Sequence, residues 1–504
     1  MTEPFYGQPT SGLKTKAIKG ATVNIVAQFV GIAVQTIGVV ILARLLKPRD
    51  FGLVAMVTAF SLWLSNFGVN GFTEYIIQKQ EVRKEEINSI FWLHLLVATI
   101  LSVVFVFFGF LLVGFYSEPA LSGIAAAMTA SFIFQALSTS PIALLKREMR
   151  FTGIAIAELI SVVLSVLLAV AAAFLGSGYW AVVTRQLTAP AVMMLGAWFL
   201  CRWRPGGPLR LAGALPALKY AVQVYLNFTL GFLMRGADKV LLGKFHGSVL
   251  LGNYDRAYHI FSMPAAQIVT PLHSVALATL SRLKHDREKF SSYFSRAVTL
   301  VAFPGTLVAL GLTVSARDLV QLLLGPNWVE AGRVVMAFGP GVVADLLFAT
   351  HSWLHLSLGT PNRWLRWNLI ASIVTLTAFL IAAPFGAVAM ATAYSIKGYI
   401  LILPGIWYAG RPIQLRLRQV IGCLRTYFLS AAVVGVSWLS LSGHWLPLKT
   451  LVTGLSPLSR ILLASCVTTV LYVAIVVLLE RGFRSIRDIL SLIPHILSRS
   501  EPSS

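Results

Sequence analysis

Apolar runs of roughly 20 residues recur along the chain from Ala21 to Leu479, and short polar or Pro/Gly-containing joints separate them. A helix of that length is long enough to cross the hydrocarbon core of a bilayer, and we count about fourteen such spans. Because a segment in lipid must satisfy its own backbone polar groups, the pattern predicts an all-α polytopic membrane protein of about 14 transmembrane helices.

The joints divide the predicted spans into successive parts. We expect a cytoplasmic N-terminal lead at 1–20, an N-terminal six-helix lobe at 21–205, a cytoplasmic linker at 206–218, a C-terminal six-helix lobe at 219–410, two additional transmembrane helices at 411–480 and a cytoplasmic amphipathic tail at 481–504. The tail alternates Arg with apolar residues at helical spacing, which predicts a helix lying at the membrane interface.

An internal repeat relates the two predicted lobes at an offset of about 200 residues. Val40–Leu45 lies over Val240–Phe245, and Phe51-Gly52 lies over Leu251-Gly252. Since an even number of spans separates the copies, the repeat is parallel. It predicts two pseudo-symmetric six-helix lobes related by an axis along the membrane normal, with a central cavity between them.

Composition agrees with this class, since 57% of the 504 residues are hydrophobic, 12% are charged and the mean hydropathy is +0.78. A soluble domain has about 25% charged residues. The formal charge of +22 suggests nucleic acid as a partner at first. However, most Lys and Arg fall on the two tails and on alternate joints, so the positive-inside rule explains the basicity and places both termini in the cytoplasm.

Charged residues inside the spans are the candidate functional residues, because a cation in a lipid-facing helix centre costs roughly 2.5–3.5 kcal/mol. The cations prevail, so a cavity lined by them suits an anionic substrate such as a phosphate or pyrophosphate. We predict substrate contacts at Arg235, Lys397, Arg185, Arg256 and Lys239. The acids available for ion coupling are Asp345, Glu158 and Asp238.

Pairing between these charges is the alternative interpretation. Arg235 lies three and four residues before Asp238 and Lys239, and Asp255 and Arg256 lie on the next predicted span. Such groups can pair across a helical hairpin and fix its packing without touching a substrate.

Glycine and proline mark the predicted hinges. Pro264 and Pro271 fall within one span, and Gly339-Pro340-Gly341 interrupts another close to Asp345. These residues can loosen a helix and let two bundles rock, although Gly and Pro are also common in ordinary membrane helices.

Enzymatic motifs are absent from the sequence. It contains no nucleotide-binding Gly-Lys-Ser/Thr loop and no metal-ligand cluster, so we predict no catalytic residues, no metal and no cofactor.

Several motifs together resemble the polysaccharide transport branch of the multidrug/oligosaccharidyl-lipid/polysaccharide (MOP) exporter superfamily, the Wzx-type flippases. The resemblance covers nearly the whole chain and rests on 42–46 with Pro48 and 50–52, on 144–151, on 237–243, on 251–258, on Pro264 with Pro271, and on 324–328 with Ala331.

The resemblance implies alternating access through a V-shaped central cavity. It also implies a substrate, an undecaprenyl-pyrophosphate-linked oligosaccharide unit that crosses the bacterial inner membrane for exopolysaccharide, capsule or O-antigen synthesis. A polysaccharide polymerase and a chain-length regulator are the expected protein partners. The alternatives are a lipid II flippase, a multidrug or cation antiporter of the same superfamily, and a non-transport scaffold of a polysaccharide synthesis complex.

Overall fold

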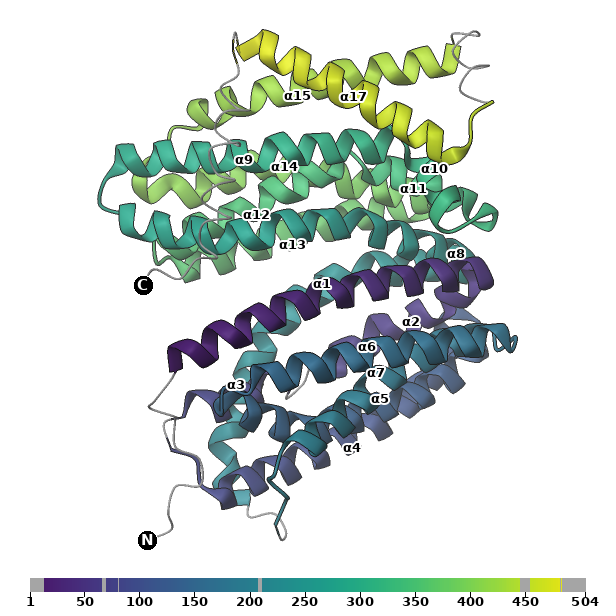
Figure 1. Ribbon diagram of the computed structural model, residues 1–504, viewed down its shortest axis with the longest axis vertical. Helices are drawn as coiled ribbons and strands as arrows, with labels where there is room; N and C mark the ends of the chain where they lie inside the picture. The colour runs from purple at the N-terminus through teal and green to yellow at the C-terminus, as the bar shows by residue number, and fades with distance from the viewer. Residues whose placement is uncertain are drawn as a thin grey trace. The chain divides into compact units, whose positions relative to one another are not determined.

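The computed structural model describes the backbone of residues 13–65, 69–79, 81–206, 211–444, 454–480 and 482. Side chains are described for the same residues except 13–22, 69–70, 211–214, 226–235, 268–271, 274, 439 and 441–444. The described chain is built from α-helices with short 3₁₀ turns, which confirms the all-α prediction (Figure 1). The predicted tail at 481–504 lies almost entirely outside the described residues.

The chain divides into two compact units, Met1–Gly252 and Asn253–Ser504. The division falls inside a long helix, whereas the lobe boundary predicted from the sequence lies at 206–218 and stays a prediction. The helices of the first unit are α1 (Leu13–Leu45), α2 (Pro48–Ser65), α3 (Val69–Gln78), α4 (Lys84–Tyr116), α5 (Ala120–Arg147), α6 (Phe151–Phe174), α7 (Tyr179–Leu200) and the first part of α8 (Leu211–Leu283).

Among its described residues, the second unit contains the end of α8 and eight further α-helices. They are α9 (Arg287–Val314), α10 (Ala316–Leu323), α11 (Val329–Phe338), α12 (Gly341–Ser357), α13 (Pro361–Ala382), α14 (Ala387–Gly410), α15 (Leu417–His444) and α17 (Pro457–Glu480).

Within the described ranges, nine helices are long and apolar enough to cross a membrane, or ten if the bent pair of α11 and α12 forms one span. The prediction of a polytopic membrane protein is therefore confirmed, while the number of about fourteen is not. Other helices, such as α2 and α7, are not among these nine candidate spans. The start of the expected C-terminal lobe at 219–410 lies in α8, which carries Asp238, Lys239, Asp255 and Arg256.

The first unit has a buried aliphatic and aromatic core where α3, α4, α5 and the start of α8 meet, which includes Phe72, Phe91, Leu144 and Trp203. Arg147 at the end of α5 is also buried, and it donates to the carbonyl oxygens of Ile76, at 2.9 Å, and of Lys79. The last carbonyls of a helix have no partner within it. One cation of the basic joint at 146–150 therefore caps α3.

Two glycines of the predicted repeat make the closest helix contact in the first unit. A Cβ at Gly52 of α2 would lie 1.7 Å from the carbonyl oxygen of Ser248, and one at Gly252 would lie 1.9 Å from that of Pro48. The approach follows a bend of α8 at Gly247, where φ is 75°. Each copy of the repeat thus presents its glycine to the residue that begins the equivalent helical segment of the other copy.

The second unit packs α12 against α14 and α9, and α15 against α9 and α17. Figure 1 shows α15 and α17 crossing beside α9. The sequence analysis missed α10, a short helix in a region expected to be a joint. Asp318 of α10 lies 3.3 Å from Arg460 of α17, so an ion pair joins the two helices.

We expect Gly52→Ala and Gly252→Ala each to destabilise the protein, because a methyl group would overlap a backbone oxygen that cannot move away cheaply. Overpacking of this kind costs about 1–3 kcal/mol or more. The measurement is membrane abundance together with thermal unfolding of the purified protein in detergent. Gly114→Ala is the control, because its Cβ would meet nothing within 4 Å. Equal stability of all three variants would contradict the close contact.

Candidate functional site in the second unit

The predicted Gly-Pro-Gly break is a real interruption of a membrane-embedded helix. The segment Pro326–Phe338 ends there and Gly341–Ser357 begins, with an angle of 49° between them. Pro340 has no N–H to donate, so the helical hydrogen-bond ladder cannot continue through it. The sequence therefore located the break correctly, while its role as a hinge stays a prediction.

Helix α14 supplies hydrogen bonds to the interrupted backbone. Ser395 Oγ donates to the carbonyl oxygen of Ala337 at 2.9 Å, and Tyr399 OH donates to that of Pro340 at 2.7 Å. A Cβ at Gly341 would lie 2.5 Å from Ser395 Oγ, so only glycine allows this approach. Gly339 and Pro340 keep helical dihedral angles, so the break is a sharp bend held by side chains of a neighbouring helix.

The same helix carries Lys397, which sits on a polar and aromatic cluster. Its Nζ lies 4.1 Å from the centre of the Tyr394 ring, and Tyr394 OH donates to Asp345 Oδ1 of α12 at 3.0 Å. A cation over a tyrosine ring is stabilised by the ring's negative face. Two residues predicted from the sequence, Lys397 and Asp345, are therefore brought together through a third that was not predicted.

Aromatic side chains surround this cluster. Tyr258 and Phe261 of α8 and Phe338 of α11 have ring centres within 5.5–6.0 Å of that of Tyr394. Phe261 and Phe338 are fully buried, whereas Tyr258 is half-buried. Flat aromatic faces can contact the rings of a sugar, and the cation beside them can contact an anionic group. The cluster of Tyr258, Asp345, Tyr394 and Lys397 is our candidate functional site.

Other predicted cations have partners close along the chain. Arg256 donates to the carboxylate of Asp255, its immediate neighbour, and both side chains are buried. His259 Nε2 lies 3.9 Å from the same carboxylate. Asp238 is buried as well and accepts a hydrogen bond from the backbone N–H of Lys239 at 2.8 Å. These contacts lie within α8, so they are not the pairing across a hairpin that the alternative interpretation expects, and whether these charges touch substrate stays a prediction.

The remaining predicted residues lie apart from the cluster along the chain. Arg185 is half-buried on α7, and Pro264 is half-buried within α8. Glu158 of α6 lines a cavity of about 320 Å³ in the first unit with the amide side chains of Asn24 and Gln28 from α1. The side chains of Arg235 and Pro271 lie outside the described residues.

Sequence reasoning missed Tyr394, Ser395 and Tyr399, the polar side chains of α14 that face the broken span. Their spacing offered a signal: Ser395 and Tyr399 are four apart and lie on one helical face with the break. Among the described residues, no group of three His, Cys, Asp or Glu side chains could hold a metal ion.

The sequence profile of a family described as polysaccharide biosynthesis protein matches residues 41–333, more than half of the chain. The chain belongs to this family. It is thus a polysaccharide biosynthesis transport protein of the Wzx-like transporter family, a multi-pass membrane protein and not an enzyme.

Relatives in the polysaccharide biosynthesis family have low but extensive similarity. The chain is 23% identical to the succinoglycan biosynthesis transport protein ExoT of Rhizobium meliloti over 74% of this chain and 79% of ExoT. It is 23% identical to the lipopolysaccharide biosynthesis protein WzxC of Escherichia coli, over 63% of this chain and 65% of WzxC. It is 21% identical to the teichuronic acid biosynthesis protein TuaB of Bacillus subtilis, over 73% of this chain and 76% of TuaB.

Two solved structures share the fold of this chain. The lipid II flippase MurJ in an inward closed conformation aligns over 92% of this chain and 99% of its own, with a TM-score of 0.70 and 13% identity. An inward-facing multidrug resistance MATE transporter aligns over 77% of this chain and 98% of its own, with a TM-score of 0.60 and 16% identity. At this identity the likeness establishes the MOP superfamily fold, which confirms the resemblance read from the motifs.

We expect Ser395→Ala and Tyr399→Phe each to destabilise the second unit by about 0.6 kcal/mol, the average for hydrogen bonds between membrane helices, and by no more than about 1.7 kcal/mol. Each variant leaves one carbonyl of the broken span without its hydroxyl donor. Thermal unfolding in detergent measures the effect. Ser352→Ala is the matched control, because that hydroxyl donates only within α12, to Ala349 at 2.7 Å. If the control costs as much, the hydroxyls of α14 have no special role at the break.

Proposed function

We propose that the protein is a flippase that moves undecaprenyl-pyrophosphate-linked oligosaccharide repeat units across the bacterial inner membrane for exopolysaccharide, capsule or O-antigen synthesis. The observation that carries the proposal is family membership together with relatives named for three different sugar polymers. Substrates that differ in their sugars can still share the same lipid-phosphate end, and one transporter fold can bind that end. Both termini face the cytoplasm in this proposal, as the distribution of Lys and Arg predicts.

The substrate contacts follow from the chemistry of a pyrophosphate joined to a sugar. Lys397 supplies a compact cation, and the half-buried rings of Tyr394 and Tyr258 supply flat apolar faces beside it. We propose Lys397 and Arg235 as the main phosphate contacts, with Arg185 and Lys239 as secondary ones. Arg256 is the weakest candidate, because the carboxylate of Asp255 already neutralises it.

Alternating access requires an element that can take two arrangements, and we propose that the break at Gly339-Pro340-Gly341 is such an element. The hydrogen bonds from Ser395 and Tyr399 tie this break to the helix that carries Lys397. A change in the charge of the site can therefore reach the break through α14. Pro264 and Pro271 of α8 are secondary hinge positions.

Ion coupling is a second part of the proposal. Asp345 accepts a hydrogen bond from Tyr394 beside Lys397, so its carboxylate lies next to the proposed phosphate contact. Protonation of Asp345 would leave Lys397 with less compensating charge and would favour an anionic substrate. Glu158 and Asp238 are the further acids proposed for coupling.

A lipid II flippase is the second candidate, because the likeness to MurJ extends over almost the whole of both chains. It predicts a defect in peptidoglycan synthesis and growth on deletion, with polymer output affected only secondarily. A multidrug or cation antiporter predicts drug sensitivity instead. A scaffold for a polymerase and a chain-length regulator predicts that removing charges inside the spans leaves polymer output unchanged.

We expect Lys397→Ala to lower the rate of repeat-unit translocation about tenfold or more, because a hydrogen bond to a charged group contributes about 1.5–3 kcal/mol. The measurement is polysaccharide output and the leaflet distribution of lipid-linked repeat units. It uses a deletion strain complemented with wild type or with Lys397→Ala at matched membrane abundance.

Lys289→Ala is the matched control, because this exposed lysine pairs with Asp286 where α9 begins and not within the proposed site. Accumulation of repeat units in the cytoplasmic leaflet with Lys397→Ala alone supports a flippase. Wild-type output from both variants refutes the role of Lys397, and unchanged polymer output in the deletion strain refutes the polysaccharide assignment itself.

A further inference from the structure

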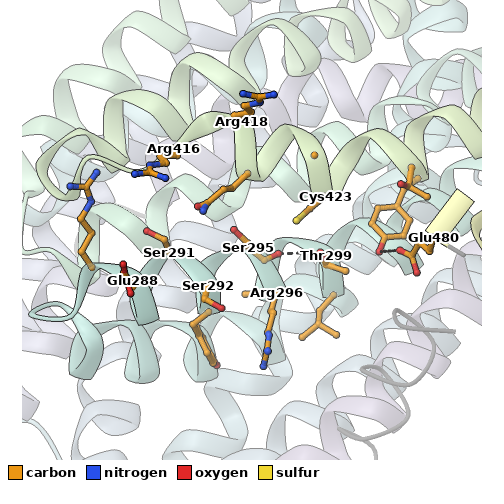
Figure 2. A pocket seen from close by; sticks show the side chains of 18 of the residues that line it. Glu288, Ser291, Ser292, Ser295, Arg296, Thr299, Arg416, Arg418, Cys423 and Glu480 are labelled. Atoms are coloured by element: carbon orange, nitrogen blue, oxygen red, sulfur yellow. Dashed lines mark hydrogen bonds between the residues drawn. The ribbon is translucent and has the colours of Figure 1, made fainter. Parts of the chain in front are cut away.

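A large cleft with a mixed polar and apolar lining lies within the second unit, between the first halves of α9 and α15. Its volume is about 1040 Å³. Figure 2 shows Ser291, Ser295 and Cys423 in the space between the two helices and Arg416 at its end. Cavities of roughly 300–1,000 Å³ hold small ligands in proteins, so the cleft has room for a sizeable head group.

Hydroxyl groups line one wall of the cleft. Ser291, Ser295 and Thr299 follow one another at intervals of four, so they lie on one face of α9. Ser295 Oγ is buried and has no hydrogen-bond partner among the described residues. A buried hydroxyl group without a partner is costly, and a polar group bound in the cleft would offset that cost.

The cleft is rimmed by four arginines and two glutamates: Arg287, Arg296, Arg416, Arg418, Glu288 and Glu480. Arg287 is fixed by bonds to Gln414, at 2.6 Å to Oε1 and 2.8 Å to the carbonyl oxygen, and Glu480 Oε1 accepts from Tyr427 at 3.1 Å. Within the described part of the chain, Arg296, Arg416 and Arg418 form no ion pair. In Figure 2, Arg296 and Arg418 extend to the outer sides of their helices, so Arg416 is the cation nearest the interior.

The helix termini add to this positive field. Both α9 and α15 begin beside the cleft, since Arg287 of α9 contacts Gln414, three residues before Leu417. The N-terminus of a helix carries about half a positive charge, which Asp286 and Glu288 partly offset at the start of α9. Both helices are long and apolar enough to cross a membrane, so we expect the end of the cleft beside their first turns to lie near a membrane surface.

We propose that this cleft binds the phosphate head group of a membrane lipid. The Arg416 guanidinium holds phosphate oxygens through paired hydrogen bonds, and the hydroxyl groups of Ser291 and Ser295 donate to further phosphate oxygens. Two lipids share this chemistry, a resident anionic phospholipid such as phosphatidylglycerol and an undecaprenyl-pyrophosphate lipid. The inference does not depend on the proposed transport function, because it concerns binding at the membrane interface and not movement across it.

The test is native mass spectrometry of the purified full-length protein in detergent, titrated separately with phosphatidylglycerol, phosphatidylcholine, undecaprenyl pyrophosphate and inorganic phosphate. We expect at least one of the two anionic lipids to bind several-fold more tightly than phosphatidylcholine. Arg416→Gln should weaken that binding about fivefold.

Two further variants separate the cleft from general surface charge. Gly422→Phe places a ring in the cleft without changing charge, and it should fold because a Cβ there would meet nothing within 4 Å. It should abolish the preference for the anionic lipid. Arg425→Gln is the matched control, because Arg425 is exposed on α15 outside the cleft, and it should leave binding unchanged.

Each outcome decides the proposal. Loss of phosphatidylglycerol binding in the cleft variants alone supports a resident phospholipid, and loss of undecaprenyl pyrophosphate binding alone supports the lipid-linked pyrophosphate. The proposal is overturned if phosphatidylcholine binds as tightly, if inorganic phosphate is the only anion bound, or if Arg425→Gln weakens binding as much as Arg416→Gln.

Discussion

Backbone hydrogen bonding in lipid is the constraint on which this structure depends. Helices satisfy it automatically, so each departure from a helix needs a substitute donor or a way to reach water. In the second unit, the break after Phe338 receives hydroxyl donors from Ser395 and Tyr399 of α14. The same requirement explains why Arg147 of the first unit is buried against the carbonyl oxygens at the end of α3. Polar side chains within the apolar helices thus often complete the backbone of a neighbour.

The charges inside the helices have different surroundings. Asp255 and Arg256 are adjacent in sequence and neutralise each other in a buried pair. Lys397 rests on the face of Tyr394, whose hydroxyl group is bound to Asp345. An ion pair in low dielectric holds its partners together strongly, and a cation over a ring is stabilised by the ring's negative face.

Much of the fold could be predicted from the sequence, because helix length and hydropathy respond to the bilayer directly. The break at Gly339–Gly341 falls where glycine and proline place it. The site was harder to predict, since it depends on which faces of α8, α12 and α14 meet. Tyr394 is one aromatic residue among many in an apolar run, and only packing places it under Lys397. The pairing of Arg256 with its neighbour rather than across a hairpin depends on rotamers that spacing does not fix.

The contact between Gly52 and Gly252 bears on how such a chain could have arisen. Each glycine of the repeat meets the backbone at the start of the equivalent segment in the other copy, near Ser248 and Pro48. A contact in which a patch meets its own counterpart is the isologous kind found in two-fold symmetric dimers. A half-length ancestor with this glycine would have been self-complementary before any gene fusion. Duplication then preserves a working interface from the outset, and each half afterwards constrains which substitutions the other can accept.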